Sequence, residues 1–192
     1  DQVVDAGGTA PLDVPEVRLW NLPPGNGVFL YEHVIYAPTT WVIPKRYYMA
    51  DGTTDYGTQR EVEAYSDDAV PLLICYRTPR YDARLTRMQR KTAQLPQDDS
   101  QTFEIWSAGG TVGVDLVPVV HSDPGLLKLD ILEPLQPGRY AIHWGALDGY
   151  TTLDERIFMF EITEKAIPDF EPIDLEMDED EEKVNDVEGD AP

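Results

Sequence analysis

The chain has almost no cysteine, because Cys75 is the only thiol among its 192 residues, and this excludes an internal disulfide. Cys75 lies in the apolar run Val70–Tyr76, where a thiol is usually buried and unreactive. A chain of this length can bury a sizeable core without cross-links. The scarcity of cysteine therefore does not by itself decide between a reducing and an oxidising compartment.

Several classes of partner are also excluded by what the chain lacks. No apolar run approaches the ~18 residues that a membrane-spanning helix needs, so we predict no membrane span. The chain carries 15 basic and 36 acidic residues, a net charge of -21, which a phosphate backbone would repel. Aromatic residues are not interleaved with the arginines either, and we therefore predict no nucleic-acid partner.

Motifs for chemistry are missing as well. His33, His121 and His143 show no H-x-x-x-H spacing and no C-x-x-C companion, so we predict no metal ion and no cofactor. No serine stands in a G-x-S-x-G frame. We predict that the chain is not an enzyme and has no catalytic residue. Its many carboxylates leave open a hydrolase whose acid pair the sequence does not distinguish.

What the sequence does contain favours short strands joined by turns. Ten Tyr, five Phe and four Trp accompany 14 Gly and 16 Pro, a mixture typical of all-β proteins. Apolar residues alternate with polar ones in three C-terminal runs, which predicts strands with one inward face. The inward sets are Leu127, Leu129 and Ile131; Tyr140, Ile142 and Trp144; and Phe158, Phe160 and Ile162.

The segment Leu135-Gln136-Pro137-Gly138-Arg139-Tyr140 is the most informative motif. Leu135 closes one strand-like run, Pro137 and Gly138 make a corner, and Tyr140 opens the next run. Within residues 126–163 this resembles the tyrosine corner of immunoglobulin and fibronectin type III sandwiches. The resemblance implies a Greek-key fold in which the tyrosine hydroxyl bonds to the backbone just upstream. It implies no function, and the paired cysteines of antibody domains are absent.

The predicted fold is therefore an all-β, Greek-key, immunoglobulin-like sandwich with extra strands. We place it at residues 16–165, between an extended N-terminal arm (1–15) and an acidic C-terminal tail (166–192). The strand-like sequence is too long for one seven-stranded module. A separate small β-layer formed by residues 16–76 is the alternative to one elaborated sandwich.

Basic residues gather between positions 77 and 91, which hold six of the 15 in the chain. Their spacings of three and four predict one short basic helix near residues 80–92. This helix would be either a solvated surface element or a contact for an anionic surface. The candidate partner-binding residues are Arg80, Arg84, Arg87, Arg90 and Lys91.

The acids are most concentrated at the other end of the chain. Low hydrophobicity and self-repulsion mean that residues 169–190 cannot fold alone. This tail would either solvate the protein or dock on a basic partner. The candidate docking residues are Asp178, Glu179, Asp180, Glu181 and Glu182.

Trp106 is the aromatic residue with the best prospect of exposure. In a strand over residues 102–107, Phe103 and Ile105 would point inward and Trp106 outward. An outward tryptophan suits a protein contact or a carbohydrate-stacking platform.

These features favour a non-enzymatic accessory or structural subunit that binds protein partners or copies of itself through charged segments. A carbohydrate-binding β-sandwich module and a hydrolase with an unrecognised site are the alternatives. The chain begins at Asp1 rather than at a methionine, and a flexible Gly-Gly stretch follows. We interpret this as the result of signal removal, which predicts a periplasmic or extracellular location.

Overall fold

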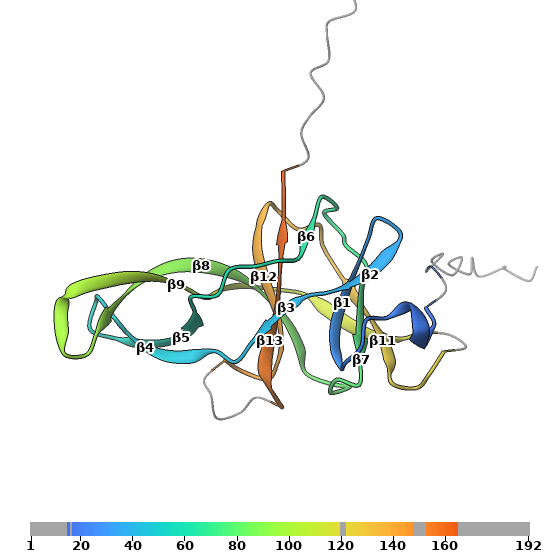
Figure 1. Cartoon of the computed structure of the whole chain (residues 1–192), viewed down its shortest axis with the longest axis horizontal. Helices are drawn as coiled ribbons and strands as arrows, with labels where there is room; N and C mark the ends of the chain where they lie inside the picture. Colours follow the sequence, from blue (N-terminus) through green and yellow to red (C-terminus); the bar gives the residue numbers. More distant parts are fainter. Residues whose placement is uncertain (1–14, 16, 120–121, 148–152, 165–192) are drawn as a thin grey trace, which may run out of the picture.

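A computed structural model describes residues 15, 17–119, 122–147 and 153–164. In these ranges the protein is a sandwich of two sheets, antiparallel except where β6 meets β13 (Figure 1). One short 3₁₀ helix, η1 (Leu19–Asn21), precedes the first strand. The strands are β1 (Gly27–Glu32), β2 (Ile35–Pro38), β3 (Thr40–Val42), β4 (Lys45–Met49), β5 (Thr54–Thr58), β6 (Tyr65–Ser66), β7 (Leu73–Tyr76), β8 (Ala83–Leu95), β9 (Asp98–Val112), β10 (Val114–Pro118), β11 (Leu126–Ile131), β12 (Gly138–Trp144) and β13 (Asp154–Ile162).

Each sheet combines strands from both halves of the chain. The smaller sheet has the order β10-β11-β7-β1-β2, and the larger runs β3-β13-β12-β8-β4-β5-β9. Because β1 pairs with β7 and β7 pairs with β11, residues 16–76 do not form a separate layer. The alternative of two packed units is therefore wrong, and the arm (except Pro15) and the tail lie outside the described residues.

The main core lies between the two sheets. The three inward sets predicted from alternation all take part in it, and Ile142, Trp144 and Phe158 are among its most deeply buried members. Trp144 packs edge-on against Phe158, with ring centroids 5.9 Å apart. Burying side chains of this size supplies about 1.5–3 kcal/mol each, so this contact contributes to the stability of the sandwich.

The corner between β11 and β12 has the geometry that its sequence implied. The Tyr140 hydroxyl donates to the Gln136 carbonyl at 2.8 Å, and the Leu135 side chain is buried. Gly138 has a φ of +148°, and Arg87 Nη2 would lie only 3.2 Å from a Cβ at that position. Arg87 also donates to the Pro137 carbonyl at 2.9 Å, so it packs over the corner and ties it to β8.

The basic helix predicted near residues 80–92 is wrong, because β8 occupies residues 83–95 as a 13-residue strand. Long-range pairing with β9, β12 and β4 overrides the local preference. Leu85 enters the main core, whereas Met88 belongs to a cluster on the opposite face of the larger sheet.

The far ends of β8 and β9 extend beyond the sandwich and form a second, smaller core (Figure 1). There β4 pairs with β8 and β5, and β5 pairs with β9, which closes a ring of four strands around Met49, Ala93 and Ile105. We call this the distal ring. A Cβ on Gly57 would lie 2.3 Å from the backbone oxygen of Trp106, so only glycine permits this approach of β5 to β9.

Both outer strands of the smaller sheet end in proline. The backbone N–H of Thr39 donates to the Val28 carbonyl, so Val28 and Thr39 form a hydrogen-bonded pair. The neighbouring pair Phe29–Pro38 is therefore a non-hydrogen-bonded one, in which the backbone nitrogen of Pro38 points away from β1 to the free edge. The register of β10 against β11 likewise places the backbone nitrogen of Pro118 at the free edge of β10. Proline has no N–H, so each edge lacks a donor that strand addition would use.

Candidate functional site

The five basic residues predicted to bind a partner all contact other parts of this chain. Arg80 donates to the Pro124 carbonyl, Arg84 pairs with Asp82 at 3.1 Å, and Arg87 belongs to the corner. Since β8 is a strand, these side chains do not share one face. The structure therefore does not bring them together as a basic surface.

The other two members of the set face different parts of the distal region. Arg90 lies over the Trp106 ring, 5.1 Å from its centroid. Lys91 pairs with Asp55, whose carboxylate also accepts from Ser107 at 2.7 Å. Partial burial raises the pKa of Asp55, but the hydrogen bonds from Lys91 and Ser107 outweigh it and hold that pKa below its usual range. The Asp55 carboxylate therefore links three strands of the distal ring, β5, β8 and β9.

Trp106 points to the outer face of the larger sheet, but its ring is already in contact with arginine. The Arg139 guanidinium lies 4.0 Å from the ring centroid, and its side chain is only 6% exposed. Arg139 donates to Glu61 at 2.9 Å and to Glu161 at 3.3 Å, which fixes it above the indole. The ring therefore does not present the free surface that carbohydrate stacking needs.

The two described histidines, His33 and His143, belong to different sheets. His143 is buried and holds Thr86 (2.8 Å) and the Gly145 carbonyl (2.9 Å) at its two ring nitrogens, whereas His33 is exposed in the β1–β2 turn. His121 lies outside the described residues. Within the described ranges no three His, Cys, Asp or Glu side chains gather closely enough to hold a metal ion. The same part of the chain has no helix long and apolar enough to cross a bilayer.

Cys75 is fully buried in β7. Burial raises the pKa of its thiol to about 12, so the thiolate form is suppressed at neutral pH. The thiol is therefore unreactive, as its apolar surroundings in the sequence predicted.

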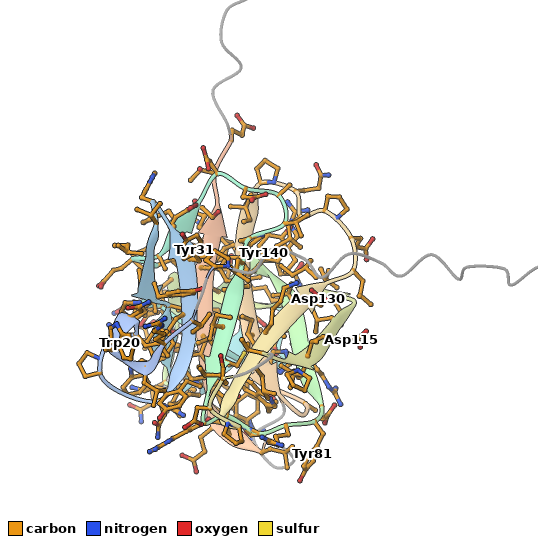
Figure 2. All side chains as sticks on the ribbon, turned by 90° about the vertical axis from the view of Figure 1, so that its right-hand side faces the viewer. Trp20, Tyr31, Tyr81, Asp115, Asp130 and Tyr140 are labelled. Atoms are coloured by element: carbon orange, nitrogen blue, oxygen red, sulfur yellow. The ribbon has the colours of Figure 1, made fainter. Side chains whose placement is uncertain are left out.

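The most distinctive surface of the described protein lies where η1 and the β1–β2 turn meet. Four large apolar side chains are exposed there: Leu19 (46%), Trp20 (74%), Val34 (83%) and Ile35 (61%). We call these four residues the hairpin-end patch. Figure 2 shows Trp20 at the periphery of the molecule, and Arg18 packs on its ring at 4.8 Å. Of the four, Val34 and Ile35 line one cavity together with Asn21 of η1, and an exposed apolar surface beside a cavity is a candidate interaction site.

A cavity of about 330 Å³ opens beside the hairpin-end patch. It is lined by Pro15, Asn21, Tyr31, Val34, Ile35 and Tyr36. The Tyr31 and Tyr36 rings pack at 4.8 Å, and the Tyr36 hydroxyl donates to the Pro15 carbonyl at 3.3 Å. Burial, with a smaller contribution from Tyr31, raises the pKa of Tyr36 to about 12, so its hydroxyl stays a donor at all physiological pH values.

The turn that carries Val34 has an unusual backbone. His33 and Val34 have φ values of 48° and 63°, as a type I′ hairpin requires. Such turns normally use Asn and Gly, because the left-handed conformation costs other residues about 1–2 kcal/mol. A β-branched residue is uncommon in this conformation, and here the side chain of Val34 is 83% exposed.

Sequence reasoning missed the hairpin-end patch for an identifiable reason. Residues 27–37 read as one uninterrupted strand, because the turn at positions 33 and 34 contains no glycine, asparagine or proline. The structure shows two strands there. The acidic docking residues Asp178, Glu179, Asp180, Glu181 and Glu182 lie outside the described residues.

Comparisons with protein-family models, with curated proteins and with solved structures found no match to this chain.

Proposed function

We propose that the sandwich has the immunoglobulin-like Greek-key topology. If β1, β7, β11 and β10 are strands A, B, E and D, the smaller sheet has the order D-E-B-A of that family, with β2 added at its edge. If β13, β12, β8 and β9 are strands G, F, C and C′, the pairings in the larger sheet include the order G-F-C-C′ of the second sheet in that family. The hydrogen bond from Tyr140 to Gln136 at the E–F corner supports the same assignment.

We propose that the protein is a non-enzymatic, exported accessory subunit that binds a partner protein through the hairpin-end patch. The observation that carries this proposal is the exposure of Val34 and Ile35 at the wall of one cavity, to which η1 contributes Asn21. Tryptophan, here Trp20, is one of the residue types enriched among the side chains that dominate binding energy in protein interfaces. The two left-handed residues of the β1–β2 turn leave Val34 83% exposed, where a partner can reach it.

The free edges of the smaller sheet favour docking by side chains over strand addition. Pro38 and Pro118 each remove an outward N–H from an edge strand, so an incoming strand would meet an incomplete set of donors. A partner would therefore use the hairpin-end patch and its cavity rather than extend the sheet. The acidic tail remains a proposed docking segment for a basic partner, whereas the arginines of β8 receive less support because each contacts this chain.

Site-specific photo-crosslinking in the producing cells tests the proposal. A benzophenone amino acid at Val34 or Trp20 should capture one discrete protein partner, and the same group at exposed Tyr81 should not. The adduct should survive ~0.5 M salt, because apolar contacts are not screened as exposed charge pairs are. Absence of a product at both patch positions, or equal products at all three, would contradict the proposal.

A further inference from the structure

We infer that the partner protein presents a lysine or arginine side chain to Glu32, beside the apolar groups with which it covers Val34 and Ile35. This inference rests on the proposed function, because it concerns the same end of the β1–β2 hairpin. It adds the chemistry of the partner, which is a basic residue flanked by apolar ones.

Glu32 is the last residue of β1 and lies next to the hairpin-end patch. In the register of β1 against β2 it is opposite Ile35, which is 61% exposed. Because side chains alternate along a strand, Glu32 shares its face with Leu30 of the main core, whereas Tyr31 points to the other face and lines the cavity. The Glu32 carboxylate therefore stands beside Ile35 at the end of the core, where the core meets solvent.

The Glu32 carboxylate has no partner within the fold. The residue is partly buried, and its Oε1 atom is buried without a hydrogen bond. Among the residues that the structure describes, no ion pair involves Glu32. Every other partly buried carboxylate in the described ranges has a hydrogen-bond donor or a cation beside it, and these are Asp55, Asp98, Asp123, Asp130, Asp154 and Glu161. Contacts within the chain therefore do not account for the position of Glu32.

Partial burial makes Glu32 a better anchor for a cation than an exposed glutamate would be. Its carboxylate has already lost water from one oxygen, so it has less hydration left to lose when a cation arrives from the solvent side. The apolar core behind the carboxylate also reduces screening, which strengthens the attraction to that cation. A salt bridge formed here would thus cost less than one between two fully hydrated groups.

The rest of the chain favours the same kind of partner. With 36 acidic and 15 basic residues, the protein has a long-range field that attracts basic surfaces and repels acidic ones. Lysine and arginine also carry aliphatic stems that pack on apolar surface while the charged group reaches further. Such a stem can cover Ile35 while its cation contacts the Glu32 carboxylate on the same face of the hairpin.

Photo-crosslinking from Val34 in the producing cells tests this inference when it is combined with a change of charge at Glu32. We would compare Glu32→Gln and Glu32→Lys with Glu63→Lys, which changes the charge of an exposed glutamate in the segment between β5 and β6. We expect the yield of the Val34 adduct to fall severalfold with Glu32→Gln and further with Glu32→Lys. The yield should stay the same with Glu63→Lys.

The outcomes separate this inference from the proposed function. An undiminished Val34 adduct in Glu32→Lys, or an equal fall in Glu63→Lys, would overturn the basic contact while the patch remained a partner surface. Failure to obtain any adduct from Val34 or Trp20 in the otherwise unchanged chain would contradict the proposed function and this inference with it.

Urea unfolding of the free protein provides a second test that needs no partner. Because Glu32 has no partner within the described chain, Glu32→Gln should leave the urea midpoint unchanged or raise it. Asp154→Asn is the matched control: Asp154 pairs with Arg156 at 2.8 Å, so its substitution should lower the midpoint. A midpoint for Glu32→Gln as low as that for Asp154→Asn would show that the carboxylate serves the fold, and the inference would then be wrong.

Discussion

Replacing Tyr140 by phenylalanine isolates the hydrogen bond at the β11–β12 corner. The ring would keep its stacking on Phe160, at a centroid distance of 5.8 Å, and only the hydroxyl would be lost. That hydroxyl donates to the Gln136 carbonyl; the Tyr140 side chain is 2% exposed, but Gln136 itself is exposed, so water can reach the acceptor once the hydroxyl is gone. A hydrogen bond of this kind contributes about 0.5–1.5 kcal/mol net.

The assay is urea unfolding followed by both circular dichroism and tryptophan fluorescence, with the free energy of unfolding extrapolated to water. We expect the Tyr140→Phe variant to lose about 0.5–1.5 kcal/mol, compared with the roughly 5–15 kcal/mol that stabilises a typical domain. Tyr81→Phe is the matched control: that residue is 67% exposed, and we expect a change within ~0.5 kcal/mol.

Arg87→Met provides a contrast at the same corner. Its bond to the Pro137 carbonyl is exposed, so water can replace the guanidinium, and the expected loss is below about 1 kcal/mol. If Tyr140→Phe proved no more destabilising than Tyr81→Phe, or less so than Arg87→Met, the buried hydroxyl would not be what stabilises the corner.

Three further predictions concern other parts of the fold. Gly57→Ala should lower the free energy of unfolding by about 1–3 kcal/mol through the clash with the Trp106 backbone. An unchanged free energy of unfolding in urea would show that β5 and β9 can move apart without cost. Trp106→Ala should destabilise the protein to a similar extent of about 1–3 kcal/mol without reducing any glycan binding, as checked by unfolding and glycan-array measurements. Burial lowers the pKa of His143 below 6.5, although the hydrogen bond to the Gly145 carbonyl opposes this shift. At a pH below about 6.5 the unfolded chain therefore binds more protons than the folded one. The contribution of His143 to the free energy of unfolding is full above about pH 6.5 and falls as the pH drops below it. The loss of unfolding free energy between about pH 7.5 and about pH 5.5 should therefore be larger in the wild type than in His143→Gln, and equal losses would contradict this assignment.

The two hydrogen bonds of His143 also fix its tautomer. The Gly145 carbonyl can only accept, so Nδ1 carries the proton and donates at 2.9 Å. Nε2 then accepts from the Thr86 hydroxyl at 2.8 Å. Protonating Nε2 would turn it into a donor to which the Thr86 hydroxyl can reorient as an acceptor, so the cost of placing a charge in this buried site is the main reason for the predicted sensitivity to acid.

Local patterns in the sequence determined which face of several strands is buried and where the corner lies. Leu127 and Leu129 share one face of a strand, as do Phe158 and Phe160, and both pairs lie in the main core. Predicting this requires only the two-residue period of a strand and one apolar core. The Tyr140 corner depends on a hydrogen bond between residues four positions apart. Such features are set by neighbours in the chain, so they can be predicted without knowledge of the strand pairing.

Tertiary structure alone decided the fate of the basic segment and the place of the exposed patch. The spacing of Arg84, Arg87 and Lys91 fits a helix, but pairing of β8 with three other strands makes it extended and gives each cation a separate partner. The cavity joins Asn21 to Val34, which are distant in sequence and separated by a strand. Long-range pairings carry no local signature, so only the folded chain shows which side chains they bring together.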